Sequence, residues 1–302
     1  MKSILQISSI SDLAKNVGFE MHHPLISIVD LSKVRFDFKS GTRVMTDFYQ
    51  VYLKNYCVNE VIYGRKRLDF KEGNLMCLAP NQVLTVQEQQ NFDQDNVGWA
   101  LFFHPDLVKG TSLWDKFKKY SFFLYEVSET LHLSEKEKNI LNECARNIQN
   151  ELLENIDSYS QNIITSSLEV FLNYCLRYYG RQFITRKSIN NNILIKIENF
   201  LDSYYKEKKF REKGLLTVKE LSEQVSMSPN YMSDLIKKET GMNAQGYIHY
   251  YLIEEAKNLL LSSDDSISEI AYNLGFEYPQ YFGKLFKRKT KLTPLEYRNS
   301  KN

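Results

Sequence analysis

Two copies of one local pattern occur in the last ninety residues, and they constrain the fold more than any other feature of the chain. In each copy a short capped helix is followed by a turn, and a proline then opens a second helix. In the first copy, Thr217 and Glu220 have the spacing of a capping box, and Pro229 opens the helix PNYMSDLIKKET after a Ser-Met-Ser turn. Gly241 is placed to end that helix, whose predicted buried face contains Met232, Leu235 and Ile236.

The second copy follows the same scheme. Ser266 and Glu269 have capping-box spacing, Gly275 provides the turn, and Pro279 opens the second helix. The predicted buried positions are Ile267, Ile270, Ala271 and Leu274 before the turn, and Phe282, Leu285 and Phe286 after it. The two copies together predict two helix-turn-helix units.

Charge is segregated within this region. The whole chain of 302 residues has a net charge of only +2, and residues 215–302 contain 11 Lys or Arg and 11 Asp or Glu. The stretch from Lys284 to Lys291 nevertheless contains five basic residues and no acidic one. An amphipathic helix with lysines outside is ordinarily only a solvated helix, but this concentration on a second helix favours contact with phosphates.

A helical stretch connects the two copies. Residues 243–263 carry Ile248, Leu252, Ala256 and Leu259 at helical spacing. About 19 helical residues span roughly 28 Å at ~1.5 Å each, and successive major-groove faces of B-DNA lie about 34 Å apart. The spacing predicts that both second helices reach one face of a DNA duplex.

The remainder of the chain changes from strand-like to helical patterns near residue 105. Short apolar and β-branched runs separated by turn residues predict a barrel or a sandwich, at residues 25–31, 44–55, 60–70, 74–79, 82–87 and 97–103. Helices are predicted over residues 134–155, 159–180 and 188–205, with a charged linker at 206–214. The apolar stripes of the first two can be buried against the strands or against the same helices of a second subunit, and the second alternative predicts a homodimer formed through residues 135–180. The predicted domains are therefore residues 1–185 for sensing and dimerisation, a helical linker at 186–214, and the double helix-turn-helix at 215–302.

The sequence IAYNLGFEYPQYFGKLFKRKTKLTPLEYR resembles the signature of the AraC/XylS family of bacterial transcription regulators. LSEQVSMSPNYMSDLIKKETG is similar to the family's first helix-turn-helix, and EEAKNLLL to its connecting helix. The resemblance covers residues 215–298 almost continuously. It implies an α+β protein with an N-terminal cupin-like β-barrel with flanking helices and a C-terminal all-α double helix-turn-helix domain.

The resemblance also implies residues that contact DNA. Base contacts are expected from Asn230, Ser233, Asp234, Pro279, Gln280, Tyr281 and Lys284. Phosphate contacts are expected from Lys237, Lys238, Lys287, Arg288 and Lys291. Tyr231 and Phe282 are expected to be packed in the core. The chain departs from the family at Lys291, where a glycine is usual, and a lysine costs about 1 kcal/mol more there if the backbone is left-handed.

The expected function is sequence-specific transcription regulation in the cytoplasm, with double-stranded DNA as partner. RNA polymerase and a small-molecule effector are further partners that the resemblance implies; activation and repression both stay open. A fragment of residues 208–302 is expected to bind DNA alone. No membrane segment, cofactor, metal site or catalytic residue is expected. The four cysteines lack metal-ligand spacing, and the absence of a signal peptide favours reduced thiols.

The alternative is a metal-dependent cupin enzyme with an accessory helical domain. Such a barrel needs clustered histidines, but His22, His23, His104 and His132 are scattered and no strand carries His-x-His. A third hypothesis is an N-terminal half that only dimerises, its interior filled by aromatic residues. The candidates for filling it are Phe36, Phe38, Phe48, Tyr52, Phe70, Trp99 and Phe102.

Overall fold

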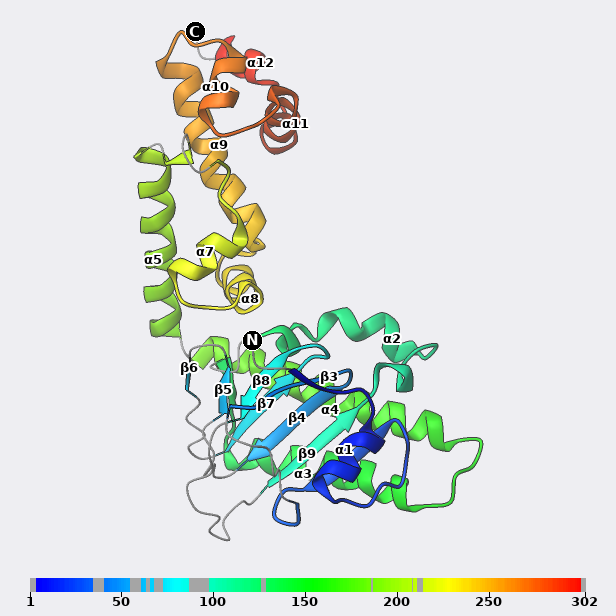
Figure 1. Ribbon diagram of the computed structural model, residues 1–302. Helices are drawn as coiled ribbons and strands as arrows, with labels where there is room; N and C mark the ends of the chain where they lie inside the picture. The colour runs from blue at the N-terminus through cyan, green and yellow to red at the C-terminus, as the bar shows by residue number, and fades with distance from the viewer. Residues whose placement is uncertain are drawn as a thin grey trace. The chain divides into compact units, whose positions relative to one another are not determined.

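The computed structural model describes residues 4–34, 41–54, 61–63, 66–67, 73–86, 98–125, 129–185, 187–207, 209–210 and 214–299. The chain forms two compact units, residues 1–185 and 186–302, and each is described by itself (Figure 1). The first unit is rich in strands and the second is entirely helical among its described residues, which confirms the predicted α+β class. No helix in the described ranges has the length and apolar character needed to cross a bilayer.

The described strands of the first unit form two five-stranded sheets. The first sheet has the order β1-β3-β8-β5-β6 and the second has the order β10-β7-β4-β9-β2. Their bounds are β1 Ile4–Ile7, β2 Ile26–Asp30, β3 Arg43–Thr46, β4 Tyr49–Lys54, β5 Val61–Tyr63, β6 Lys66–Arg67, β7 Asn74–Leu78, β8 Val83–Val86, β9 Gly98–Phe103 and β10 Leu131–His132. Within the described residues no strand pairing joins the two sheets into a closed barrel.

An apolar core lies between these sheets and includes α1 (Ile10–Val17). Phe48 and Phe102 are both completely buried in it, and their rings meet edge to face with centroids 5.9 Å apart. Tyr52 packs against the same cluster. These residues pack between the sheets, as the hypothesis of an aromatic-filled interior expects, whereas Phe36, Phe38 and Phe70 lie outside the described residues.

The other face of the second sheet is covered by the long helices α3 (Glu135–Leu153) and α4 (Ser160–Thr185). Trp99 lies on this face, because its indole Nε1 donates to Asn142 Oδ1 at 2.9 Å and its ring packs edge to face on Phe171. The prediction that Trp99 fills the space between the sheets is therefore wrong. A period of two identifies which strand residues share a face but not which face meets the helices.

Between β9 and α3 the chain forms α2 (Ser112–Lys116) and three short 3₁₀ helices, at Pro105–Leu107, Phe117–Lys119 and Ser121–Leu124. The amino-terminal β1 and α1 were not predicted from the sequence. Helix α1 has the signals of a short helix, since Ser9 Oγ accepts a hydrogen bond from Asp12 N at 3.0 Å and Gly18 ends it with φ of 79°.

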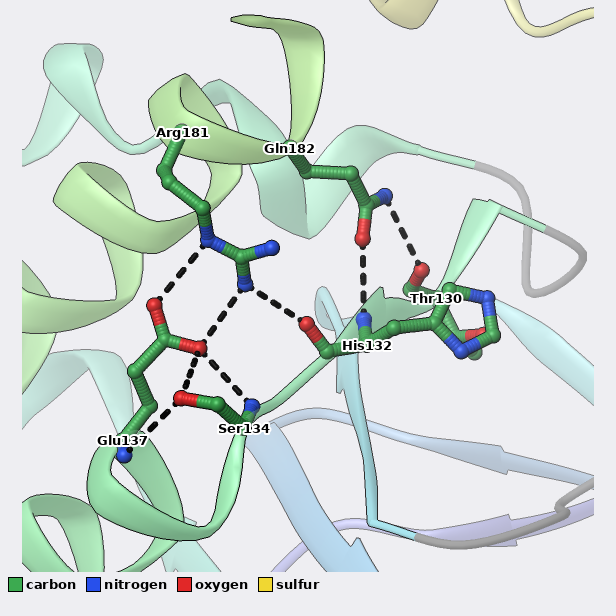
Figure 2. A network of polar contacts seen from close by, with 6 residues as sticks. All are labelled: Thr130, His132, Ser134, Glu137, Arg181 and Gln182. Atoms are coloured by element: carbon green, nitrogen blue, oxygen red, sulfur yellow. Dashed lines mark hydrogen bonds and ion pairs between the residues drawn. The ribbon is translucent and has the colours of Figure 1, made fainter. Parts of the chain in front are cut away.

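A polar network fixes the end of α4 to the junction between β10 and α3 (Figure 2). The Arg181 guanidinium donates from Nε to Glu137 Oε1 at 3.0 Å and from Nη2 to Glu137 Oε2 at 2.9 Å. It also donates to the His132 carbonyl at 2.7 Å, while the Gln182 side chain accepts from His132 N at 2.9 Å. We call this set of contacts the Arg181 network. It holds the end of α4, whose last residue is also the last residue of the unit.

The second unit contains seven helices in its described residues. They are α5 Lys187–Lys206, α7 Val218–Gln224, α8 Pro229–Thr240, α9 Ala244–Ser262, α10 Ile267–Asn273, α11 Pro279–Thr290 and α12 Pro294–Asn299. Helix α9 runs through the unit, with α7 and α8 near one end and α10, α11 and α12 near the other (Figure 1). Every helix of the second unit described here contributes to one continuous apolar core or packs against it.

Helix α5 belongs to this core. Ile197, Leu201, Tyr204 and Tyr205 are each at most 4% exposed, and Tyr247 of α9 donates a hydrogen bond to Glu198 at 2.8 Å. Phe210, in the charged stretch predicted to be a linker, is also buried in the core of this unit.

Candidate nucleic-acid interface

The turn between α7 and α8 has a defined backbone geometry. Helix α7 ends at Gln224, and Ser226 then takes a left-handed conformation with φ of 56°. The amide of Met227 donates back to the carbonyl oxygen of Ser222 at 3.1 Å. This bond over five residues is the one expected at a helix end that closes with a left-handed residue.

The turn between α10 and α11 repeats this geometry. The amide of Phe276 donates to the carbonyl oxygen of Ala271 at 3.0 Å, and Gly275 has φ of 85°. Here the turn is also crowded, because a Cβ on Gly275 would lie 3.0 Å from the Gly214 carbonyl carbon and 3.1 Å from the Phe210 carbonyl oxygen. The two predicted units are therefore confirmed as structural copies, and the second has backbone packed against its turn.

The two second helices begin differently. Ser228 caps α8, since its Oγ accepts from Tyr231 N at 3.1 Å, and Tyr231 is buried as expected. Helix α11 begins after Tyr278, which makes no side-chain capping bond. Both helices have proline at their first position, as the sequence predicts.

In the first helix-turn-helix unit (α7 and α8), the residues predicted to contact bases are half-buried. Asn230, Ser233 and Asp234 all lie on α8 in this environment. The Ser233 hydroxyl oxygen accepts a hydrogen bond from Ala244 N at 3.4 Å, which links α8 to the first residue of α9. The buried face predicted for α8, with Met232, Leu235 and Ile236, is confirmed.

In the second helix-turn-helix unit (α10 and α11), the predicted base-contacting residues are more exposed. Gln280, Tyr281 and Lys284 are exposed on α11, and Pro279 is half-buried at its start. Their orientation is fixed by the opposite face of the helix, where Phe282, Leu285 and Phe286 enter the core as predicted. The structure thus brings these four residues together in the first two turns of α11.

The basic side chains predicted to contact phosphates lie in or just after the last turn of each second helix. Lys237 and Lys238 are exposed on α8, and Lys287 and Arg288 are exposed on α11. Cations in this position are also favoured by the helix dipole. The fifth predicted residue, Lys291, is exposed immediately after α11.

Lys291 has a left-handed backbone. Its φ is 69° and its ψ is −7°, almost the same as the 76° and −6° of Gly241, which ends α8. The amides of Lys291 and Gly241 donate to Lys287 and Lys237, respectively, four residues earlier. The conformation on which the predicted cost of Lys291 depends is therefore present.

His249 is a residue near the interface that the sequence did not indicate. It is half-buried on α9, with its Nε2 2.9 Å from Gln245 Nε2. Burial lowers the pKa of His249, and the nearby charges of Lys289 and Arg288 lower it further. The basic end of α11 therefore lies close enough to α9 to affect this imidazole. The one signal available in the sequence is that residues 186–302 contain a single histidine.

Two histidines of the N-terminal unit have structural partners. His23 Nδ1 accepts from Leu25 N at 3.1 Å, and His104 Nδ1 accepts from Asp106 N at 3.2 Å. Among the residues that the structure describes, no three His, Cys, Asp or Glu side chains are arranged to hold a metal ion. Cys77 and Cys175 are fully buried, and burial raises the pKa of both thiols.

A hollow of about 290 Å³ opens on the N-terminal unit at the edge of the core between the sheets, with which it shares Val29 and Val34. It is bounded by the α1–β2 connection, one stretch of β2 and the end of α3, and its polar lining includes Glu20, His22, Asp30 and Lys33. Such a volume is at the lower limit of the usual range for small-molecule sites.

Comparison with known proteins identifies relatives of this chain. Residues 221–300 match the family model of a helix-turn-helix domain. The chain is 29% identical over 142 residues to the uncharacterized HTH-type transcriptional regulator YijO of Escherichia coli (strain K12), covering 47% of this chain and 46% of that protein. It is 33% identical over 82 residues to the HTH-type transcriptional activator RhaS of Salmonella arizonae, covering 27% of this chain and 30% of that protein. This chain therefore spans less than half the length of both relatives.

Among solved structures, the C-terminal domain of the two-component response regulator yesN from Fusobacterium nucleatum is 34% identical in sequence. The match covers 35% of this chain and 98% of that domain, with a TM-score of 0.31.

The matched residues 221–300 include both turns and both second helices described above. The family match and the names of the relatives confirm the resemblance found in the sequence. Residues 221–300 of this chain therefore form a helix-turn-helix domain, as in the HTH-type transcriptional regulators that the chain resembles.

Proposed function

We propose that the protein is a transcription regulator that binds double-stranded DNA in a sequence-specific way through both helix-turn-helix units. The observation that carries this proposal is the presence of two units with one turn geometry in a single core, connected by the 19 residues of α9. At ~1.5 Å per residue this helix is about 28 Å long, near the ~34 Å between successive major-groove faces. The two second helices then read successive segments of one groove.

The exposed residues of α11 suit base recognition. Gln280 has the amide that pairs with adenine, and Lys284 has the ammonium group that donates to guanine. In the first helix-turn-helix unit, Asn230 has the amide that pairs with adenine, and Asp234 can accept a hydrogen bond from the amino group of cytosine. The basic side chains at the helix ends neutralise phosphates and set the register, as the sequence predicts for Lys237, Lys238, Lys287, Arg288 and Lys291.

Site selection from random duplex DNA tests this function. We expect full-length protein to enrich a site with two repeated half-sites and the fragment 187–302 to enrich one half-site. If neither protein enriches a sequence, the proposal is wrong.

Substitutions of exposed side chains on α11 distinguish contacts to bases from contacts to phosphates. Gln280→Ala and Lys284→Ala should each reduce affinity for the selected site by about 1–3 kcal/mol while changing affinity for random DNA much less. Lys196→Ala, an exposed lysine on α5 outside both helix-turn-helix units, is the matched control and should change neither. Equal losses on both DNAs would show that these side chains contact only phosphate.

We also propose that the protein forms a homodimer through the predicted region 135–180, with α4 at its centre. The exposed apolar residues Ile163, Val170 and Ile184 lie at intervals of seven and fourteen residues along α4. A seven-residue interval places residues on one side of a helix, as in helices that pair. The Ile163→Lys variant tests this interface. Its molar mass in solution, measured by light scattering, should shift from that of a dimer to that of a monomer.

Control by a small molecule bound in the first unit, contact with RNA polymerase and a cytoplasmic location complete the proposed function. Within the described residues, the hollow beside β2 and α3 supports this control as a candidate ligand site. Thermal unfolding of the full-length protein in the presence of candidate metabolites tests the effector, because a ligand that binds the folded protein raises its melting temperature.

A further inference from the structure

The start of α11 departs from a rule that its neighbours follow. Helices α7, α8, α9 and α10 begin after a residue whose side-chain oxygen accepts a backbone amide hydrogen bond, namely Thr217, Ser228, Asn243 and Ser266. Helix α11 begins after Tyr278, whose hydroxyl lies at the far end of a rigid ring and makes no such bond. A helix without this cap is less stable, so the tyrosine is not explained by the local structure that it starts.

Tyr278 also presents its ring to solvent. It is 54% exposed, and Tyr281 in the first turn of α11 is 62% exposed. Their rings meet edge to face, with centroids 5.8 Å apart and planes at 80°. This geometry is the favourable one for two aromatic rings, so they support each other in one orientation. We call these two residues the tyrosine pair.

The tyrosine pair lies at the end of α11 where sequence is read. In a helix-turn-helix protein the first residues of the second helix approach the base edges. Gln280 and Lys284 are exposed in the same two turns, so the pair adds aromatic edges beside an amide and an ammonium group. The apolar group that the major groove presents for such an edge is the C5 methyl of thymine.

We propose that Tyr278 and Tyr281 together recognise a thymine methyl group, and that Tyr278, which lies outside the helix, is a specificity-determining residue. The inference rests on the proposed function, because it requires α11 to enter the groove. It accounts for two features of Tyr278: the helix gives up a capping side chain, and the exposed ring gains a contact in the complex. Departures from local sequence rules are expected at functional positions of this kind.

Replacing thymine by uracil tests the proposal, because uracil lacks only this methyl group. In the site selected by full-length protein, each thymine is replaced singly and the dissociation constant is measured. At one or two thymines under α11 we expect affinity to fall about fourfold, the factor that corresponds to losing the burial of one methyl group.

Two variants of the full-length protein complete the test. Tyr278→Ser should reduce the thymine-to-uracil ratio at those positions from about four to about one. Its melting temperature should not fall, because serine supplies the missing cap. Tyr272→Ser is the matched control, since Tyr272 is 57% exposed but lies on α10, and it should keep the ratio of the unchanged protein.

The proposal is overturned if no thymine under α11 is sensitive to uracil, or if Tyr278→Ser keeps the sensitivity. Both results leave DNA binding and the proposed function intact. Failure of the protein to select any DNA sequence would instead overturn the proposed function together with this inference.

Discussion

A left-handed residue closes both second helices, and it is glycine at position 241 but lysine at position 291. A side chain disfavours this conformation by about 1 kcal/mol or more. We therefore expect Lys291→Gly to raise the free energy of unfolding of fragment 187–302 by about 1 kcal/mol, measured by urea denaturation. Lys289→Gly, which places glycine within the last turn of α11, is the control and should lower it by about 1 kcal/mol. A loss of stability in both variants would contradict the argument from backbone conformation.

His249 gives the second unit a distinct dependence on pH. Its pKa in the folded state is lowered from the ordinary value of 6.5, by burial first and then by Lys289 and Arg288. The unfolded chain therefore binds a proton more readily, and the stability associated with neutral His249 is present above pH 6.5 and is lost as the pH falls through the lower folded pKa. We expect the free energy of unfolding of fragment 187–302 to fall less between pH 7.5 and 5.5 in His249→Gln.

Because fragment 187–302 contains no other histidine, the difference between the two curves reports on this one group. Parallel curves for the fragment and its His249→Gln variant would show that the folded environment does not alter protonation at this position.

At the scale of elements, the Arg181 network determines how the end of α4 is held. Its central pair is sheltered, with the Arg181 side chain 35% exposed and that of Glu137 14% exposed. Hydrogen bonds to charged groups typically contribute about 1.5–3 kcal/mol. Arg181→Ala should therefore lower the free energy of unfolding of the first unit by about 2 kcal/mol, measured by denaturation of the full-length protein.

Lys33→Ala is the control for this variant. It removes the partner of Asp30 from an exposed ion pair in the same unit, and such pairs contribute little. Equal effects of the two substitutions would show that the Arg181 network is no stronger than a surface pair.

Local signals in the sequence predicted several elements well. The capping boxes of Thr217 with Glu220 and of Ser266 with Glu269 are both present in the structure, because a cap depends only on residues three positions apart. The same holds for the prolines that start α8 and α11. The capping defect at Tyr278 is visible in the sequence, but its contact with Tyr281 and its exposure required the structure.

Features that depend on contacts between residues far apart in the chain could not be predicted from local sequence signals. The stretch at 206–214 reads as a charged linker, yet Phe210 is buried against helices far along the chain. The face on which Trp99 lies depends on which side of the second sheet receives α3 and α4, and a strand's own periodicity contains no such information. His249 and the basic end of α11 are forty residues apart and were brought together only by the packing of α9.

At the scale of the whole molecule, the core of the second unit defines which fragment can fold. Helix α5 contributes four residues that are at most 4% exposed, namely Ile197, Leu201, Tyr204 and Tyr205. Burying each large apolar side chain contributes about 1.5–3 kcal/mol. We expect fragment 187–302 to unfold cooperatively. Fragment 208–302, which the sequence alone predicts to bind DNA, should be largely unfolded because it lacks α5, and circular dichroism melting measures both.

The purified fragments also provide a check on this boundary. If 208–302 melts at the same temperature as 187–302, then α5 is not part of the cooperative unit despite its burial.

The two turns have one geometry but very different surroundings, and this difference affects how freely each can change by mutation. Position 226 already holds a serine in the left-handed conformation, so other small polar residues are admissible there. Position 275 has the backbone of Gly214 and Phe210 within about 3 Å of where any side chain would begin. As the gene drifts, sequence changes are therefore easier to accommodate in the turn between α7 and α8 than in the turn between α10 and α11.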